Sequence, residues 1–244
     1  MIDNKYIRGL SIDWSSVPED SYLRGIPAIA GLSGMTFSGS VTFFVGENAT
    51  GKSTLLEAIA VAYGFNPEGG TLNYRFSTWD DVSELGGAVR LVKGFRRPPV
   101  GYFFRAESFF NLASKAAEYD EGVGPSYGAR GLHEQSHGES FLSFFQTFDG
   151  PGLYLMDEPE AAVSPQRQLT LLTLMARMAA RGAQFIVASH SPILLGLPEA
   201  RILSFDGGEI REIAWEETDS YQVTRLFIER REALLRQLLE RDDD

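Results

Sequence analysis

Residues 41–53 read Val41-Thr42-Phe43-Phe44-Val45-Gly46-Glu47-Asn48-Ala49-Thr50-Gly51-Lys52-Ser53, and this segment alone indicates an architecture. Its first five residues are β-branched or aromatic, as in a strand that is buried on both faces. Its last eight fit the phosphate-binding pattern G-x-x-x-x-G-K-[ST]. Strong helix formers follow from Thr54 to Tyr63, until Gly64 ends the pattern. A strand, a glycine loop and a helix in this order predict an α/β fold of the P-loop NTPase class.

Each fixed position of the loop has a physical reason. Glycines let backbone N–H groups turn toward a polyphosphate, and the new helix presents the positive end of its dipole to the same anion. We expect Lys52 to bridge the β- and γ-phosphates and the Ser53 hydroxyl to bind Mg²⁺. The predicted ligands are therefore ATP and Mg²⁺. The candidate nucleotide-binding residues of this segment are Gly46, Glu47, Asn48, Ala49, Thr50, Gly51, Lys52, Ser53 and Thr54.

A second apolar strand, predicted over 153–157, ends in two carboxylates, Asp157 and Glu158. If this strand neighbours the one before the loop, Asp157 lies beside the phosphates and can hold Mg²⁺. Glu158 would then act as the general base that polarises the attacking water. The alternative interpretation is a surface turn with two acids.

Two further elements follow along the chain. Ser164 and Pro165 predict the N-cap and first turn of a helix that runs to about Arg181. A third core strand is predicted over 184–188, with His190 near its tip. We interpret His190 as a γ-phosphate sensor, and an ordinary histidine at a strand end is the alternative.

The order of these motifs resembles the ATP-binding-cassette (ABC) type ATPases, in particular the soluble branch with SMC, RecF and OLD-type heads. Four segments are also similar to a small stand-alone group of bacterial AAA-type ATPases: 46–48, 105–111, 136–140 and 157–162. The resemblance covers nearly the whole chain as one domain, 1–244. It implies a mainly parallel core sheet, an antiparallel N-terminal portion and a helical signature lobe at about 107–148. It also implies a homodimer in which the signature of one subunit closes on nucleotide held by the other.

Two positions take their expected roles from this resemblance. Arg105 stands where the family has the glutamine of its Q-loop, and we expect it to contact phosphate or to pair with Glu107. Ser164 stands where an aspartate is usual. The signature position is occupied by Ser136, His137, Gly138 and Glu139. A serine hydroxyl and a glycine N–H at a helix start are suitable donors to a γ-phosphate.

Composition limits the possible functions. A chain of 244 residues without cysteine has no disulfide, thiol nucleophile or thiolate metal site. A net charge of −11 repels nucleic acid at long range, so a DNA contact would need a local basic patch. No apolar run approaches the roughly 20 residues that cross a bilayer. We therefore expect a cytoplasmic protein without membrane insertion, with DNA or another protein as a possible partner.

Several alternatives remain open. Residues 133–137 read H-E-x-x-H, a zinc-protease pattern, but Gly138 follows where a zinc-binding helix would have to continue. Within the resemblance, the function is an ATPase switch in DNA maintenance or phage defence, a transporter nucleotide-binding subunit, or a scaffold with slow turnover. Trp14 and Tyr22 are candidate adenine-stacking residues, and core packing is the alternative for both.

Overall fold

The computed structural model describes residues 5–72, 84–106, 145 and 150–239. Its main feature is a seven-stranded sheet with five parallel strands in the middle and an antiparallel strand at each edge. This confirms the predicted α/β fold with a mainly parallel core sheet. The order across the sheet is β10 (Arg211–Ile213), β9 (Arg201–Ser204), β3 (Val41–Val45), β8 (Gln184–Ala188), β7 (Leu153–Asp157), β6 (Gly101–Arg105) and β4 (Gly70–Thr71).

A second, three-stranded sheet is antiparallel throughout. β1 (Ile7–Ile12) lies between β2 (Gly34–Thr36) and β5 (Val89–Lys93). This sheet is the antiparallel N-terminal portion that the resemblance implies.

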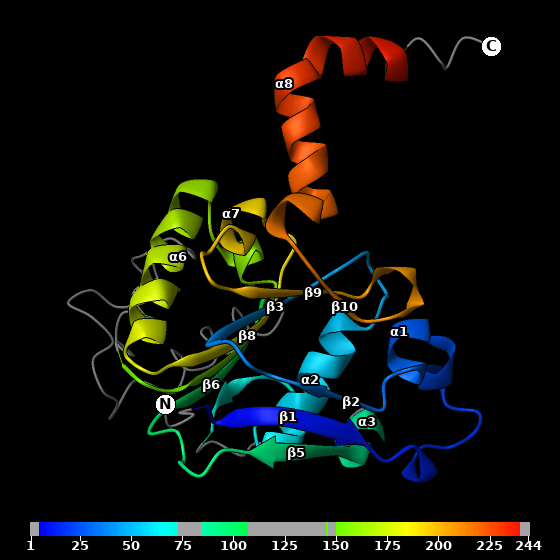
Figure 1. Cartoon of the computed structure of the whole chain (residues 1–244), viewed down its shortest axis with the longest axis vertical. Coiled ribbons are helices and arrows are strands. Elements are labelled where there is room, and N and C mark those ends of the chain that lie inside the picture. The colour runs from blue at the N-terminus through cyan, green and yellow to red at the C-terminus, as the bar shows by residue number, and fades with distance from the viewer. Residues whose placement is uncertain (1–4, 73–83, 107–144, 146–149, 240–244) are drawn as a thin grey trace, which may run out of the picture.

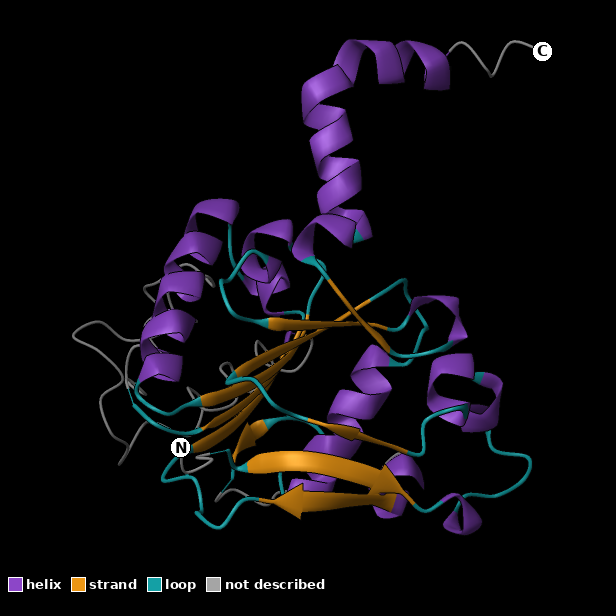
Figure 2. Cartoon of the chain, viewed as in Figure 1, coloured by secondary structure: helices purple, strands orange, loops and turns teal. Residues whose placement is uncertain are grey.

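Helices cover both faces of the large sheet (Figures 1 and 2). α2 lies between the two sheets, and α6 and α7 lie on the opposite face of the large sheet. Successive residues of the central strands therefore point into two different cores. The helices are α1 (Pro27–Ala30), α2 (Lys52–Tyr63), α3 (Glu84–Ala88), α6 (Pro165–Ala180), α7 (Pro192–Leu195) and α8 (Asp219–Leu239).

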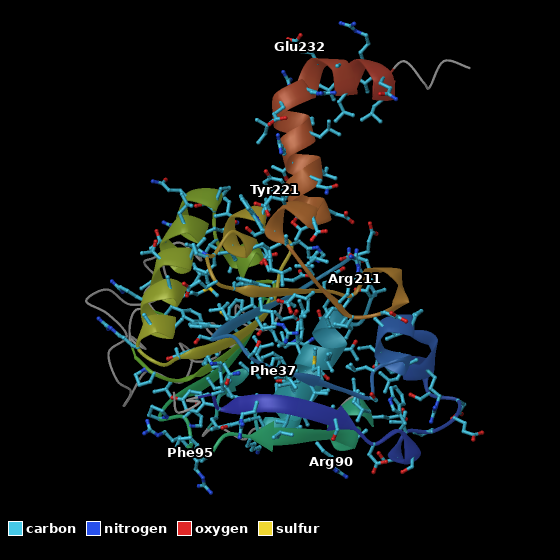
Figure 3. The ribbon with its side chains drawn as sticks, in the orientation of Figure 1. Phe37, Arg90, Phe95, Arg211, Tyr221 and Glu232 are labelled. Carbon is cyan, nitrogen blue, oxygen red and sulfur yellow. The ribbon has the colours of Figure 1, made fainter. Side chains whose placement is uncertain are left out.

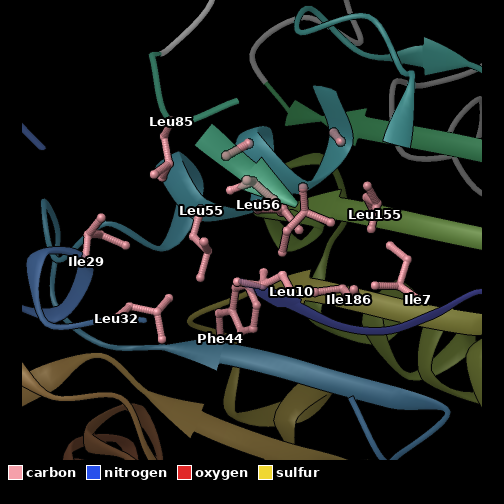
Figure 4. Packing of buried hydrophobic residues seen from close by; sticks show 14 of the residues in the cluster. Ile7, Leu10, Ile29, Leu32, Phe44, Leu55, Leu56, Leu85, Leu155 and Ile186 are labelled. Carbon is pink, nitrogen blue, oxygen red and sulfur yellow. The ribbon is translucent and has the colours of Figure 1, made fainter. Parts of the chain in front are cut away.

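The core on the α2 side joins the two sheets. Phe44 of β3, Leu155 of β7 and Ile186 of β8 pack there with Leu55 and Leu56 of α2 (Figure 4). All five side chains are fully buried. This packing fixes α2 against the carboxyl ends of the parallel strands, where the candidate site lies.

Gln184 links the two sheets through its side-chain amide. This residue is 2% exposed. Its Oε1 accepts hydrogen bonds from the N–H groups of Tyr6 and Ile7 at 2.8 and 2.9 Å, and its Nε2 donates to the Ile7 carbonyl at 2.7 Å. The first residue of β8 thus satisfies three backbone groups at the start of β1, as buried polar groups require.

One local prediction was only partly right. Ser164 occupies the N-cap position of α6, but its side chain makes no capping hydrogen bond. Gln168 instead ties the start of the helix to the preceding turn, because its Nε2 donates to the Val163 carbonyl at 3.2 Å. The predicted signature lobe lies almost wholly outside the described residues.

The last helix extends away from the rest of the molecule. α8 has no buried residue and bends at Arg230, where the backbone leaves helical geometry. Figure 3 places Tyr221 near its base and Glu232 beyond the bend. The Tyr221 ring packs on Trp215 with the centroids 4.5 Å apart. No helix among the described residues combines the length and apolar character needed to span a bilayer.

Candidate nucleotide-binding site

The phosphate-binding loop connects β3 to α2 in the conformation that its glycines predict. Gly46 and Gly51 have φ angles of 140° and 97°, which a side chain rarely allows. A Cβ at Gly51 would also lie 2.6 Å from Cγ1 of Ile29 in α1. Ala49 adopts a positive φ of 64° without being glycine. Its strained backbone lies in the exposed tip of the loop, between two positions that must be glycine.

Lys52 lies inside this loop. The residue is 5% exposed, and its Nζ donates to the carbonyls of Gly46 at 2.7 Å and Glu47 at 2.6 Å. Burial lowers the pKa of the Lys52 ammonium, and the carboxylates of Glu158 and Asp206 act most strongly against that shift. The positively charged ammonium thus lies inside the loop, where its hydrogen bonds go to neutral backbone carbonyls.

Ser53 and Asp157 meet, although their strands are not neighbours. We predicted contact through adjacent strands, but β8 lies between β3 and β7. The first turn of α2 crosses over β8, so that the Ser53 hydroxyl donates to Asp157 Oδ1 at 2.9 Å. A hydroxyl and a carboxylate oxygen suit Mg²⁺, which commonly takes few protein ligands and fills its octahedron with water and phosphate oxygens. These two residues therefore fit the predicted metal.

Glu158, the residue after Asp157, faces His190 in the loop that follows β8. Glu158 has a left-handed backbone with φ 49°. Its Oε1 lies 3.8 Å from Nε2 of His190, beyond direct hydrogen-bond distance. Nε2 of His190 is buried and has no hydrogen-bond partner among the described residues. Burial and the Lys52 charge lower the pKa of the imidazole, which favours its neutral form.

Arg105 lies one strand away from this centre. It pairs with Asp157 in the register of β6 and β7. Its Nη1 donates to Glu57 Oε2 at 2.8 Å and to the Pro67 carbonyl at 3.0 Å. Glu57 stands one turn after Ser53 on α2, so the Arg105 ion pair lies next to the predicted metal ligands. Contact between Arg105 and phosphate stays a prediction, and Glu107 lies outside the described residues.

Two acidic residues at the site were missed from the sequence. Asp206, just after β9, accepts a hydrogen bond from the Glu47 N–H at 2.8 Å and from Ser204 Oγ at 3.1 Å. Glu160 accepts hydrogen bonds from the loop after β8, at Ser189 and His190. Asp206 comes shortly after a strand, as Glu158 does, which was the available signal.

The remaining predicted residues divide into two groups. Asn48 is exposed at the loop tip, and Thr54 is half-buried in the first turn of α2. The signature residues Ser136, His137, Gly138 and Glu139, together with His133 of the zinc-protease pattern, lie outside the described residues. Among the described residues, no group of three or more His, Asp or Glu side chains could hold a metal ion.

Comparison with known proteins gives the following matches. The family described as "AAA domain, putative AbiEii toxin, Type IV TA system" matches residues 140–196. The hemin import ATP-binding protein HmuV of Rhodopseudomonas palustris is 27% identical over 193 residues, which are 70% of this chain and 71% of that protein.

Two solved structures are also similar. The SMC head domain from Thermotoga maritima has a TM-score of 0.44 at 14% identity, covering 86% of this chain and 98% of that one. MJ1267, an ATP-binding cassette of an ABC transporter, has a TM-score of 0.44 at 15% identity, covering 87% and 93%. The family match and the relative HmuV, with the P-loop geometry, support the predicted resemblance to ABC-type P-loop ATPases.

Proposed function

We propose that this chain binds ATP, hydrolyses it in a Mg²⁺-dependent reaction, and couples the nucleotide to closure of a homodimer. The observation that carries the proposal is the 2.9 Å contact between Ser53 and Asp157. It joins a hydroxyl at the start of the phosphate-loop helix to a carboxylate at a strand end, and the buried Lys52 ammonium lies in the adjacent loop. This arrangement suits a polyphosphate bound with a divalent cation.

The side chains divide the chemistry among them. Lys52 exchanges its two carbonyl partners for phosphate oxygens, because a charged acceptor binds an ammonium more strongly than a neutral one. Ser53 and Asp157 hold Mg²⁺, which neutralises charge on the phosphates when it is bound. Glu158 accepts the proton of the attacking water, and His190, neutral with its proton on Nε2, donates to the γ-phosphate.

Closure would complete the site. In the ATPases that this chain resembles, a signature segment contacts the γ-phosphate bound to the other subunit, and Ser136 and Gly138 are the matching residues here. A γ-phosphate between two subunits makes the dimer depend on ATP, since ADP lacks that group. We assign the switch to DNA maintenance or phage defence in the cytoplasm.

A second candidate function has one specific observation in its favour. The curated relative is named a hemin import ATP-binding protein. This chain would then serve as the nucleotide-binding subunit of a transporter. Co-purification with a membrane subunit would favour that function, and ATP hydrolysis stimulated by DNA would favour the first.

Phosphate release tests the proposal. We expect the wild-type protein to release phosphate from ATP only with Mg²⁺, and Glu158→Gln to lower kcat by about 10²- to 10⁴-fold, as expected for loss of a general base. Glu232→Gln, an isosteric change on the exposed α8, is the matched control and should leave kcat unchanged. A folded wild-type protein that binds ATP but releases no phosphate, with or without DNA, would overturn the assignment as a hydrolase.

A further inference from the structure

The side chain of Glu160 joins the two loops that carry the proposed catalytic residues. Its Oε2 accepts a hydrogen bond from Ser189 Oγ at 2.9 Å, and its Oε1 accepts one from the backbone N–H of His190. Burial raises the pKa of the Glu160 carboxyl, and these hydrogen bonds act against that shift. Both oxygens of a largely buried carboxylate thus point to a single loop, the one that carries His190.

The turn that holds Glu160 is itself rigid. It is a short 3-10 helix over Pro159–Ala162, and proline fixes the backbone at its first position. The Ala161 N–H donates to the Glu158 carbonyl at 3.1 Å, and the Val163 N–H donates to the Glu160 carbonyl at 3.2 Å. Glu158 and Glu160 therefore cannot move independently.

The two loops are connected at two points. The Glu158 N–H donates to the Ala188 carbonyl at 3.0 Å, which continues the pairing of β7 with β8. The Glu160 carboxylate then makes the second connection two residues further along each loop. Two connections fix both the separation and the relative orientation of the two loops, whereas a single backbone hydrogen bond would let one loop turn against the other.

His190 depends on this second connection. Its Nε2 is buried 3.8 Å from Glu158 Oε1 and finds no hydrogen-bond partner among the described residues. An unsatisfied buried nitrogen is costly and would turn away to water if its loop were free. A misplacement of about 1 Å in a catalytic group can cost roughly 100-fold in rate.

We propose that Glu160 is a positioning residue that holds His190 at a fixed separation from Glu158, and that it acts through its two hydrogen bonds and not through its charge. This inference rests on the proposed function, because it assigns His190 and Glu158 to the same reaction. It adds a residue that touches neither nucleotide nor metal in that proposal.

Two substitutions separate hydrogen bonding from charge. In Glu160→Gln the amide oxygen can accept from the His190 N–H, and the amide nitrogen can donate to Ser189 Oγ once that hydroxyl rotates. In Glu160→Ala both side-chain hydrogen bonds are lost, while the backbone hydrogen bond from Glu158 to Ala188 remains. We expect Glu160→Gln to keep kcat within about twofold, and Glu160→Ala to lower it about 10- to 100-fold with an unchanged Kd for ATP.

Each outcome decides the proposal. A folded Glu160→Ala variant with wild-type kcat would overturn it, and so would a Glu160→Gln variant as slow as Glu160→Ala, because charge would then be essential. Ser189→Ala removes one of the two hydrogen bonds to the Glu160 carboxylate and replaces Glu160→Ala as the test if that variant does not fold. We expect it to lower kcat about threefold or more, again at unchanged Kd, and wild-type kcat in this variant would count against the proposal.

A second measurement needs no hydrolysis and separates this proposal from the proposed function. The chain has three histidines, so nitrogen-15 histidine spectra resolve His190, with His190→Asn for assignment. Burial and Lys52 lower the pKa of His190, while Glu158, Asp206 and Glu47 raise it. If Glu160→Ala releases the loop, exposure of the imidazole should raise that pKa toward its ordinary value, whereas Glu160→Gln should not change it.

If the wild-type protein hydrolyses no ATP, the proposed function fails and this titration alone decides the position of His190. An unchanged His190 pKa in Glu160→Ala would show that the loop keeps its place without the carboxylate, and the positioning role would be wrong.

Discussion

The ion pair between Arg105 and Glu57 should be measurable both in stability and in nucleotide preference. The side chains of Arg105 and Glu57 are 23% and 16% exposed, and their closest atoms are 2.8 Å apart. Exposed ion pairs contribute about 0.2–1 kcal/mol, and hydrogen bonds to charged groups contribute about 1.5–3 kcal/mol. Since this pair is mostly buried, we expect a coupling energy of about 1–2 kcal/mol, between these two ranges.

A double-mutant cycle isolates this energy. Arg105→Gln, Glu57→Gln and the double variant remove the charges one at a time, and the cycle cancels the effect of the shorter glutamine side chain at position 105, which both Arg105 variants share. Loss of the coupling should lower the Tm by about 2–8 °C, at 2–4 °C per kcal/mol for a chain of this size. The double variant should be more stable than the sum of the single effects predicts, because it leaves no unpaired charge.

Nucleotide preference then tests the role of Arg105. If Arg105 leaves Glu57 to bind the γ-phosphate, Glu57→Gln removes a competitor and should tighten ATP binding up to about fivefold, equivalent to about 1 kcal/mol. ADP binding should change little, because ADP has no γ-phosphate. If calorimetry gave the same ratio of ATP affinity to ADP affinity in the wild-type protein and in Glu57→Gln, the ion pair between Arg105 and Glu57 would be purely structural. Arg105 would then not contact the γ-phosphate.

Four other measurements test the site and the fold. Lys52→Ala should sharply weaken ATP binding in a folded protein. If calorimetry gave wild-type ATP affinity for this variant, the loop over 46–53 would not be the phosphate-binding site. ATP hydrolysis should need Mg²⁺ and should survive a zinc-selective chelator. If the purified protein instead contained stoichiometric zinc, and His133→Ala lost both the zinc and the activity, the metalloprotease alternative would be favoured. Glu158→Gln should trap ATP between two subunits, and light scattering should give a mass near twice 27.0 kDa with ATP and near the monomer with ADP. Adding Ser136→Arg should restore the monomer, and dimers that persist with ADP or with Ser136→Arg would contradict the signature assignment. Gln184→Leu leaves three backbone groups unpaired and should lower the free energy of unfolding by about 3 kcal/mol or more, at 1–3 kcal/mol for each unsatisfied group; an unchanged urea midpoint would mean that the two sheets hold together without this amide.

The predicted strands agreed with the structure where the strand is buried on both faces of the sheet. β3, β7 and β8 have the bounds predicted from their apolar runs, because a strand covered on both faces is made mostly of apolar residues. The meeting of Ser53 with Asp157 was also expected, since the loop that follows β3 and the carboxyl end of β7 lie at the same edge of the sheet. The reason given for it was incomplete, because it overlooked the strand between them.

Contacts between single side chains could not be predicted. Glu47 and Asp206 are 159 positions apart, and Arg105 and Glu57 are 48 positions apart. No local periodicity marks such pairs, because only the tertiary fold brings them together. Glu160 was missed for a different reason: within the segment 157–162 only Asp157 and Glu158 were given roles, and nothing in the sequence links Glu160 to Ser189 and His190.

The amide of Gln184 also bears on the order in which the chain can fold. Tyr6 and Ile7 make three hydrogen bonds to the side chain of Gln184, which lies 177 positions beyond Ile7. At synthesis rates of about 5–20 residues per second, β1 must wait roughly 9–35 s before β8 exists. Closing so long a loop is slow because its entropy is lost before any contact forms. β1 can pair with β2 and β5 as soon as those strands are made, but Gln184 cannot tie this small sheet to the large one until β8 exists.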